Sequence, residues 1–171
     1  METNLNHTDL SLMTAIVNSI QEDGWNIQVK EIYSRNSFYA LIYNEAKQIR
    51  VRIYIWNLTH GGGAARAADE YRIQITGVDR FEQREGEKTL ILGWWEPIGV
   101  FAGFDFYKHN GQLGASPSIQ IREENLRNAL INGFSAGDKD NGEIAIAFRP
   151  SDTLPLRSSP NATTIAESCS S

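Results

Sequence analysis

The sequence predicts an α+β domain with two helices and a strand-rich, strongly bent, mostly antiparallel sheet or open pseudobarrel. Seven or eight segments alternate apolar and polar residues as half-buried strands do. Most are joined by short connections, which favour antiparallel pairing because a parallel crossover needs about a dozen residues or more. Two other segments repeat apolar residues at helical spacing. The 171 residues leave room for one ordinary domain and its tails.

The first helix is expected over residues 8–23, where Thr8 can cap its start and Gly24 can end it. Its core face repeats Leu12, Met13, Ile16, Val17 and Ile20. The second helix is expected over residues 122–133, ending near Gly133. Alternating runs predict strands at residues 25–33, 37–44, 48–56, 70–78, 88–95, 99–107, 118–122 and 143–150.

The strand expected at residues 48–56 has two contrasting faces. Its apolar face carries Ile49, Val51, Ile53 and Ile55. Its other face carries Arg50, Arg52, Tyr54 and Trp56. Because cationic and aromatic side chains together suit nucleic-acid contact, this second face is a candidate binding surface.

Composition and charge narrow the class of protein. Hydrophobic content of 41% and charged content of 22% are typical of a soluble globular domain. A net charge of −5 argues against a protein coated in positive charge, but it leaves a local basic face possible. The single cysteine, Cys169, rules out a disulfide framework and a thiolate metal cluster. We expect a cytoplasmic protein without a signal peptide or a membrane partner.

We expect one recognition domain over residues 1–150, followed by a tail or linker over residues 151–171. The last segment is rich in Ser, Pro, Thr and Asn and has little with which to pack. Such an ending is compatible with a domain taken from a longer protein.

Two glycine patterns resemble a serine hydrolase but lack its other parts. His60 precedes Gly61, Gly62 and Gly63 as in an esterase oxyanion loop, and "GFSAG" around Ser135 matches a nucleophile elbow. All three histidines precede Ser135, so no base follows the nucleophile, and Ser135 is expected in a loop after a helix. We therefore exclude this reaction.

Other catalytic sites have weak support in the sequence. Asp105 is the best single catalytic carboxylate, although it is more simply a cap for the turn that follows it. The loop from Asp138 to Glu143 offers further carboxylates. Three scattered histidines and no clustered cysteines predict no metal site, and no cofactor is expected.

The candidate DNA-binding residues are cationic or aromatic. Arg66 and Arg72 lie in and beyond a glycine-rich loop whose exposed amides could hold a phosphate, although a plain hairpin tip is the simpler interpretation. Arg122 is a possible phosphate contact, although a strand-to-helix corner is the simpler interpretation of this residue. The full set is Arg50, Arg52, Trp56, His60, Arg66, Arg72, Tyr107, Lys108, His109 and Arg122.

Four ordered blocks between Arg50 and Pro150 resemble a domain of restriction–modification systems. They are "EYRIQITG", "LILGWWEPIGVFAGFDFYKH", "SPSIQIREENLRNAL" and "GEIAIAFRP". Domains of this kind occur beside HNH-type nucleases and DNA methyltransferases, generally as the non-catalytic part. The resemblance implies a reader of sequence or of a modified base, with a B3-like or SRA-like barrel.

Two classes of function follow. The first is a DNA-recognition module of a restriction or defence nuclease, with double-stranded DNA as partner and the nuclease domain in the same or another chain. A homodimer is compatible with this function, and a flipped base would require an aromatic-walled pocket. The alternatives are a stand-alone nuclease or hydrolase using Asp105 or the Asp138–Glu143 loop, and a protein–protein adaptor.

Overall fold

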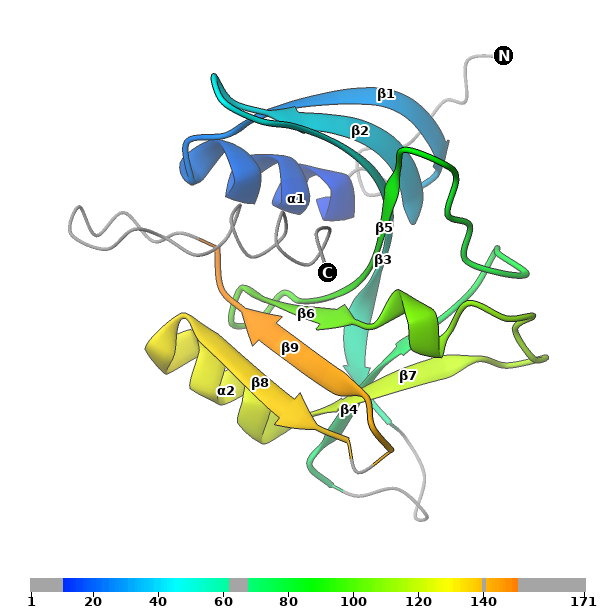
Figure 1. Ribbon diagram of the computed structural model, residues 1–171. Helices are drawn as coiled ribbons and strands as arrows, with labels where there is room; N and C mark the ends of the chain where they lie inside the picture. Colours follow the sequence, from blue (N-terminus) through cyan, green and yellow to red (C-terminus); the bar gives the residue numbers. More distant parts are fainter. Residues whose placement is uncertain (1–10, 62–67, 140, 151–171) are drawn as a thin grey trace.

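The computed structural model describes residues 11–61, 68–139 and 141–150 (Figure 1). Its helices are α1 (Ser11–Glu22), the 3-10 helix η1 (Phe106–Lys108) and α2 (Glu123–Asn132). Its strands are β1 (Asn26–Ser34), β2 (Ser37–Tyr43), β3 (Gln48–His60), β4 (Glu70–Gln74), β5 (Lys88–Trp95), β6 (Val100–Phe104), β7 (Ser118–Arg122), β8 (Phe134–Asp138) and β9 (Ile144–Phe148). Thr8, the predicted cap of α1, lies outside the described residues.

The strands form one open sheet in the order β1-β2-β3-β5-β6-β9-β8. β4 pairs with the last residues of β3, and β7 pairs with β4. Of the eight pairings in the described residues, seven are antiparallel. The predicted class, an α+β fold around an open, mostly antiparallel sheet, is therefore confirmed. The exception is the pair β3–β5. After β3 the chain passes through β4 and then enters the sheet again as β5, which lies parallel to β3 on the edge opposite β2.

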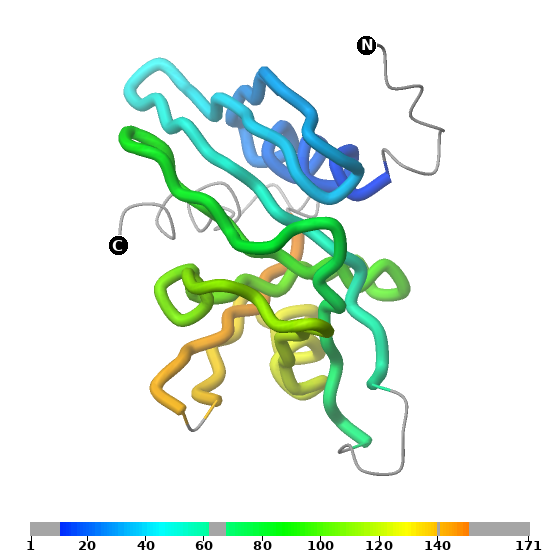
Figure 2. Tube along the Cα trace, turned by 90° about the vertical axis from the view of Figure 1, so that its right-hand side faces the viewer, coloured from blue at the N-terminus to red at the C-terminus, as the bar shows by residue number. Residues whose placement is uncertain are grey.

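The two main helices cover opposite faces of the sheet at opposite ends of the molecule (Figures 1 and 2). We name the face under α1 the α1 face. It buries Ile16 and Ile20 of α1 together with residues of β2 and β3 and with Leu90 and Leu92 of β5. The face under α2, the α2 face, buries Leu126 and Ala129 against β4, β6, β7 and β9. Residues that alternate along one strand therefore enter two different cores.

Glycines end the helices where the sequence predicts. Gly24 (φ 84°) follows α1, and Gly133 (φ 88°) is the C-cap of α2, with its N–H donating to the carbonyl of Ala129. Both adopt the left-handed conformation that glycine adopts without steric cost. No helix within the described ranges is both long and apolar enough to span a bilayer.

One predicted loop is a strand. Residues 134–138, which contain Ser135, form β8 and pair with β9 in an antiparallel hairpin. Gly, Ser and Asp are rare in strands, so local propensity predicts a loop there. Pairing with the apolar strand β9 outweighs that propensity. The elbow-like "GFSAG" therefore lies in a strand rather than at a strand-to-helix turn, which removes the context that a hydrolase needs.

Candidate nucleic-acid interface

The structure separates the predicted binding residues into groups. One group lies on the short sheet formed by the end of β3 with β4 and β7. A second lies on the segment that contains η1. Others are buried, and Arg66, with most of the glycine-rich loop, lies outside the described residues.

The outward side of the β3–β4–β7 sheet is polar in every row. Thr59, Arg72 and Gln120 stand opposite one another across the three strands. The rows on either side pair Glu70 with Arg122 and Gln74 with Ser118. We name this surface the polar sheet face, and it consists of Thr59, Glu70, Arg72, Gln74, Ser118, Gln120 and Arg122.

Buried residues alternate with the polar sheet face and fix its orientation. Leu58, Ile73 and Ile119 form one row that points into the core under α2. Since successive side chains of a strand point to opposite faces, the polar residues must point away from that core. Burial of the apolar row thus fixes the direction in which the polar side chains point.

Arg72 occupies the middle of the polar sheet face. Its side chain is half-buried, and its Nε is buried without a hydrogen-bond partner among the described residues. A buried N–H without an acceptor costs about 1–3 kcal/mol, and a bound phosphate or base edge would supply the acceptor. Arg72 is therefore the candidate ligand contact of this face.

Neighbouring side chains hold the two amides of this face. Gln74 Nε2 donates to Ser116 Oγ at 3.2 Å and to the carbonyl of Pro117 at 3.0 Å. Gln120 Nε2 donates to Ser118 Oγ at 3.1 Å. Both amides are therefore preorganised, which lowers the entropy lost when a ligand binds.

His60 belongs to this sheet, but its side chain lies on the side opposite the polar sheet face. It ends β3, and its row faces the α2 side with Tyr71, whose ring lies edge-on at 5.4 Å. Its Nε2 makes a hydrogen bond of 2.5 Å with the carbonyl of Ala68. His60 therefore closes the base of the connection between β3 and β4.

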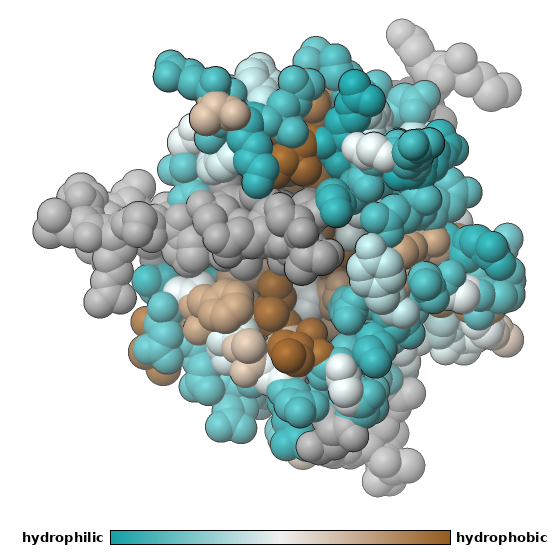
Figure 3. All heavy atoms as spheres, viewed as in Figure 1, coloured by the Kyte–Doolittle hydropathy of each residue, from teal (hydrophilic) through white to brown (hydrophobic). Residues whose placement is uncertain are grey.

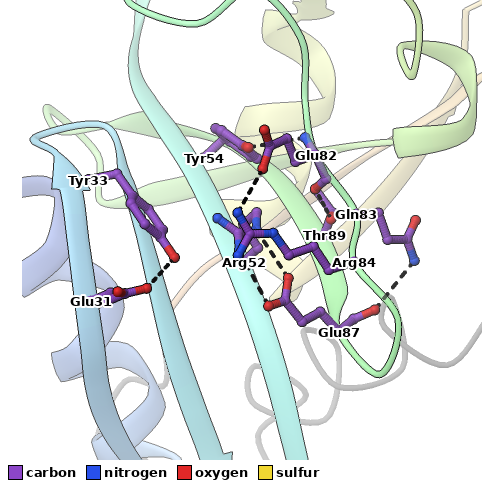
Figure 4. A network of polar contacts seen from close by, with 9 residues as sticks. All are labelled: Glu31, Tyr33, Arg52, Tyr54, Glu82, Gln83, Arg84, Glu87 and Thr89. Atoms are coloured by element: carbon purple, nitrogen blue, oxygen red, sulfur yellow. Dashed lines mark hydrogen bonds and ion pairs between the residues drawn. The ribbon is translucent and has the colours of Figure 1, made fainter.

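Arg52 is predicted as a DNA contact but is buried, with 3% of its surface exposed (Figure 4). Its Nε lies 3.1 Å from Glu87 Oε2, and its guanidinium lies 4.9 Å from the ring centre of Tyr33. Burial alone would lower its pKa, but the hydrogen bonds with Glu87 and Tyr33 outweigh burial and raise it. Arg52 thus joins the 82–87 loop to β3, which removes it from the candidate surface.

Trp56 is also buried, so of the predicted cationic and aromatic face of β3 only Arg50 is exposed. Its ring stacks on Tyr54 and meets Phe81 edge-on at 6.1 Å. Its Nε1 donates to Thr76 Oγ1 at 3.3 Å. The alternation along β3 is as predicted, but both faces are buried over residues 51–56.

The two adjacent tryptophans of β5 pack in the two cores. Trp95 is buried on the α2 face. Trp94 is half-buried and lies against Phe101, with ring centres 4.4 Å apart. The sequence suggested that one of the two rings could stack on a base. The ring of Trp94 instead covers Phe101.

The segment Phe106–His109, which we name the aromatic loop, follows β6. Tyr107 is 62% exposed, and Lys108 is exposed as well. Asp105 caps η1 by accepting a hydrogen bond from the backbone N–H of Tyr107 at 2.9 Å. The interpretation of Asp105 as a cap is therefore confirmed.

His109 is part of a charge cluster around Glu143, which is only 1% exposed. Glu143 Oε1 lies 2.7 Å from His109 Nε2, and Oε2 lies 2.9 Å from Lys139 Nζ. Burial alone would raise its pKa, but hydrogen bonds with His109 and Lys139 outweigh burial and lower it to about 2. The cluster joins the β8–β9 hairpin to the aromatic loop.

The carboxylates proposed for catalysis have structural partners. Asp105 caps η1, and Glu143 is bound on both oxygens. Within residues 11–61, 68–139 and 141–150, no three His, Cys, Asp or Glu side chains are grouped so that they could hold a metal ion.

Arg50 lies away from the other candidates. It is exposed near the start of β3, beside Lys30 and Tyr39 at a shallow hollow between β1, β2 and β3. The polar sheet face begins near the other end of the same strand. The structure therefore does not bring Arg50 to Arg72 and Arg122.

Five members of the polar sheet face were not predicted from the sequence, Glu70 among them. The other four are Thr59, Gln74, Ser118 and Gln120. The signal was present, because "EYRIQ" and "SIQIR" both place arginine and glutamine at alternate positions beside buried isoleucines. A search for polar rows across expected strands would have found them.

Together, the fold and this geometry define an α+β domain that presents arginine, amide and hydroxyl side chains on an open sheet. The chain belongs to the methylase-associated X1 family, whose model matches residues 49–154, more than half of its length. Neither the search of curated proteins nor the search of solved structures gives a match. The family description supports the predicted association with restriction–modification systems.

Proposed function

We propose that this protein is a DNA-recognition module of a restriction–modification or defence system, reads sequence or modified bases and is not catalytic by itself. It binds double-stranded DNA through the polar sheet face. The observation that carries this proposal is Arg72, a half-buried arginine on a face of ordered amides and hydroxyls, whose Nε has no hydrogen-bond partner within the described part of the chain.

The side chains of this face match the chemistry of base edges and phosphates. Arginine forms paired hydrogen bonds with guanine, and glutamine does so with adenine. Serine, threonine and further arginines hold phosphate oxygens and fix the register on the duplex. Arg72 and Gln120 stand side by side in one row, so one row offers both kinds of contact.

The shape of the sheet supports the same function. β4 and β7 form an antiparallel pair that branches from the end of β3. A two-stranded ribbon of this kind fits the major groove of B-form DNA, which is about 12 Å wide. The outward row of the pair would then point at base edges.

The charge balance predicts selective rather than general binding. With a net charge of −5, most of the surface repels a duplex, and only local arginines attract it. The catalytic part of the system would lie in the same or another chain, and a homodimer would place two such faces on one duplex.

Duplex binding by the full chain tests this function. We expect fluorescence anisotropy to show binding to short duplexes, unmodified or cytosine-methylated, that weakens at least tenfold from about 50 mM to about 200 mM salt. A target-selective module would prefer some duplexes over others. Absence of binding to every duplex at the lower salt would contradict the proposal and favour a protein–protein adaptor.

A second experiment tests for nuclease activity: the same protein is incubated with a plasmid and Mg²⁺. The proposal expects intact plasmid, since the candidate carboxylates Asp105 and Glu143 are held in structural contacts. Cutting that is lost in Asp105→Asn would instead support the stand-alone nuclease.

A further inference from the structure

Among the described residues, a helix covers only half of the α1 face. α1 packs on β3 and the first strands, and α2 lies on the opposite face near β6, β8 and β9. On the other half, β5, β6 and β9 line a cleft of about 390 Å³. Figure 3 shows apolar atoms gathered near the middle of the molecule, where Figure 1 places β9.

The floor of the cleft is apolar and flat. Leu90 and Leu92 of β5 lie beside Ile146 and Phe148 of β9. Between these strands stands Gly103, where an added Cβ would come within 2.9 Å of Ile146 Cγ1. The absence of a side chain at Gly103 leaves room for the side chain of Ile146 on the paired strand.

Aromatic and charged side chains surround this floor. The aromatic loop supplies Phe106 and Tyr107, whose rings meet edge-on at 5.5 Å. Gln83, Lys88 and Asp105 complete the border and provide an amide, an ammonium and a carboxylate group. The cleft therefore has apolar surfaces for stacking and polar groups for hydrogen bonds.

We propose that this cleft binds a single nucleobase that has swung out of the DNA duplex. The inference goes beyond duplex binding by the polar sheet face, although it rests on the proposed function for its ligand. A volume of about 390 Å³ exceeds that of one base and is in the range of sites for small molecules. Enzymes and readers that take a base out of the stack hold it against aromatic or apolar side chains and bind its edge through hydrogen bonds.

The border favours a base over an apolar peptide. Lys88 lies at the cleft, and the exposed Lys108 is next to Tyr107 in the aromatic loop. Two cations near an aromatic wall suit a base flanked by phosphates, because stacking and phosphate attraction then act together. The apolar floor also accommodates the methyl group that a DNA methylase adds.

Two duplexes of the same sequence test the inference, one fully paired and one with a central base opposite an abasic site. Unpairing lowers the cost of extruding that base, so a base-binding cleft should favour the second duplex about tenfold. We expect the full chain to show this preference by anisotropy. With 2-aminopurine as the unpaired base, binding should also change its fluorescence, since stacking on Tyr107 changes its emission.

Two variants connect the preference with the cleft. Ile144 lines the cleft and is 58% exposed, so Ile144→Trp fills the cleft without opening the core. Tyr107→Ala removes the exposed wall instead. Each should lose the preference for the unpaired base and retain binding to the paired duplex, whereas Ile131→Trp on α2, at a position 73% exposed, should retain both.

Failure of the inference and failure of the proposed function give different results. Equal binding of both duplexes by the wild-type protein would overturn the base-binding cleft while leaving duplex recognition intact. A preference that survives in Ile144→Trp and Tyr107→Ala would overturn it as well. No binding to either duplex would instead contradict the proposed function on which the inference rests.

Discussion

Replacing Glu143 by glutamine is expected to lower the free energy of unfolding by about 2–3 kcal/mol at neutral pH. The carboxylate is buried and holds both Lys139 and His109, so the neutral amide leaves two donors with a weaker partner. Urea unfolding of wild type and Glu143→Gln measures this difference. The matched control, Glu85→Gln in an exposed loop, should change stability by less than about 0.5 kcal/mol.

The contribution of Glu143 should disappear in acid. Its pKa falls from the ordinary value of 4.5 to about 2 on folding, so the folded protein binds this proton less readily than the unfolded chain. Stability from this group is therefore present above pH 4.5 and is lost as the pH falls towards about 2. We expect the gap between wild type and Glu143→Gln to narrow over that window. A constant gap would contradict the assigned role.

Replacing Arg52 by alanine is expected to lower the free energy of unfolding by about 3 kcal/mol. The change leaves Glu87, which is only 12% exposed, without its cation and removes the group that packs on Tyr33. Urea unfolding measures the loss. The folded fraction of the variant should bind DNA with the wild-type salt dependence, because Arg52 does not reach the surface.

Arg84→Ala is the matched control for Arg52. Arg84 lies in the same region, is exposed and contacts Glu82 at 3.5 Å, a surface pair that contributes little to stability. Its replacement should change stability by less than about 0.5 kcal/mol. If Arg52→Ala kept its stability and instead reduced the salt dependence of DNA binding, Arg52 would be a phosphate contact after all.

The strands were predictable because their alternation is local. β5 and β7 occupy the predicted residues, and the glycine ends of both helices follow from simple backbone rules. β8 was not predictable from local sequence, since its glycine, serine and aspartate are poor strand formers that only pairing with β9 holds extended. The parallel pairing of β3 with β5 joins residues far apart in the sequence, so local patterns do not predict it.

The site was only partly predictable, because alternation identifies two faces without telling which one meets solvent. Arg52 and Trp56 seemed to share a surface, yet both are buried: Trp56 in the core under α2, and Arg52 between Glu87 and Tyr33. Arg72 and Arg122 were predicted individually, and the register of β4 with β7 places them on one face. The contact of His109 with Glu143 joins residues 34 positions apart, which sequence spacing does not predict.

The salt dependence of duplex binding by Arg72→Ala tests the central claim most directly. We expect the variant to stay folded, since Arg72 Nε makes no hydrogen bond with the described residues, and to bind its best duplex about tenfold or more weakly. If Arg72 contacts a phosphate, the slope of log K against log salt should also fall by about 0.9. Arg84→Ala should keep both the affinity and the slope of wild type. Unchanged affinity and slope in Arg72→Ala would contradict the assignment of the polar sheet face as the DNA-binding surface.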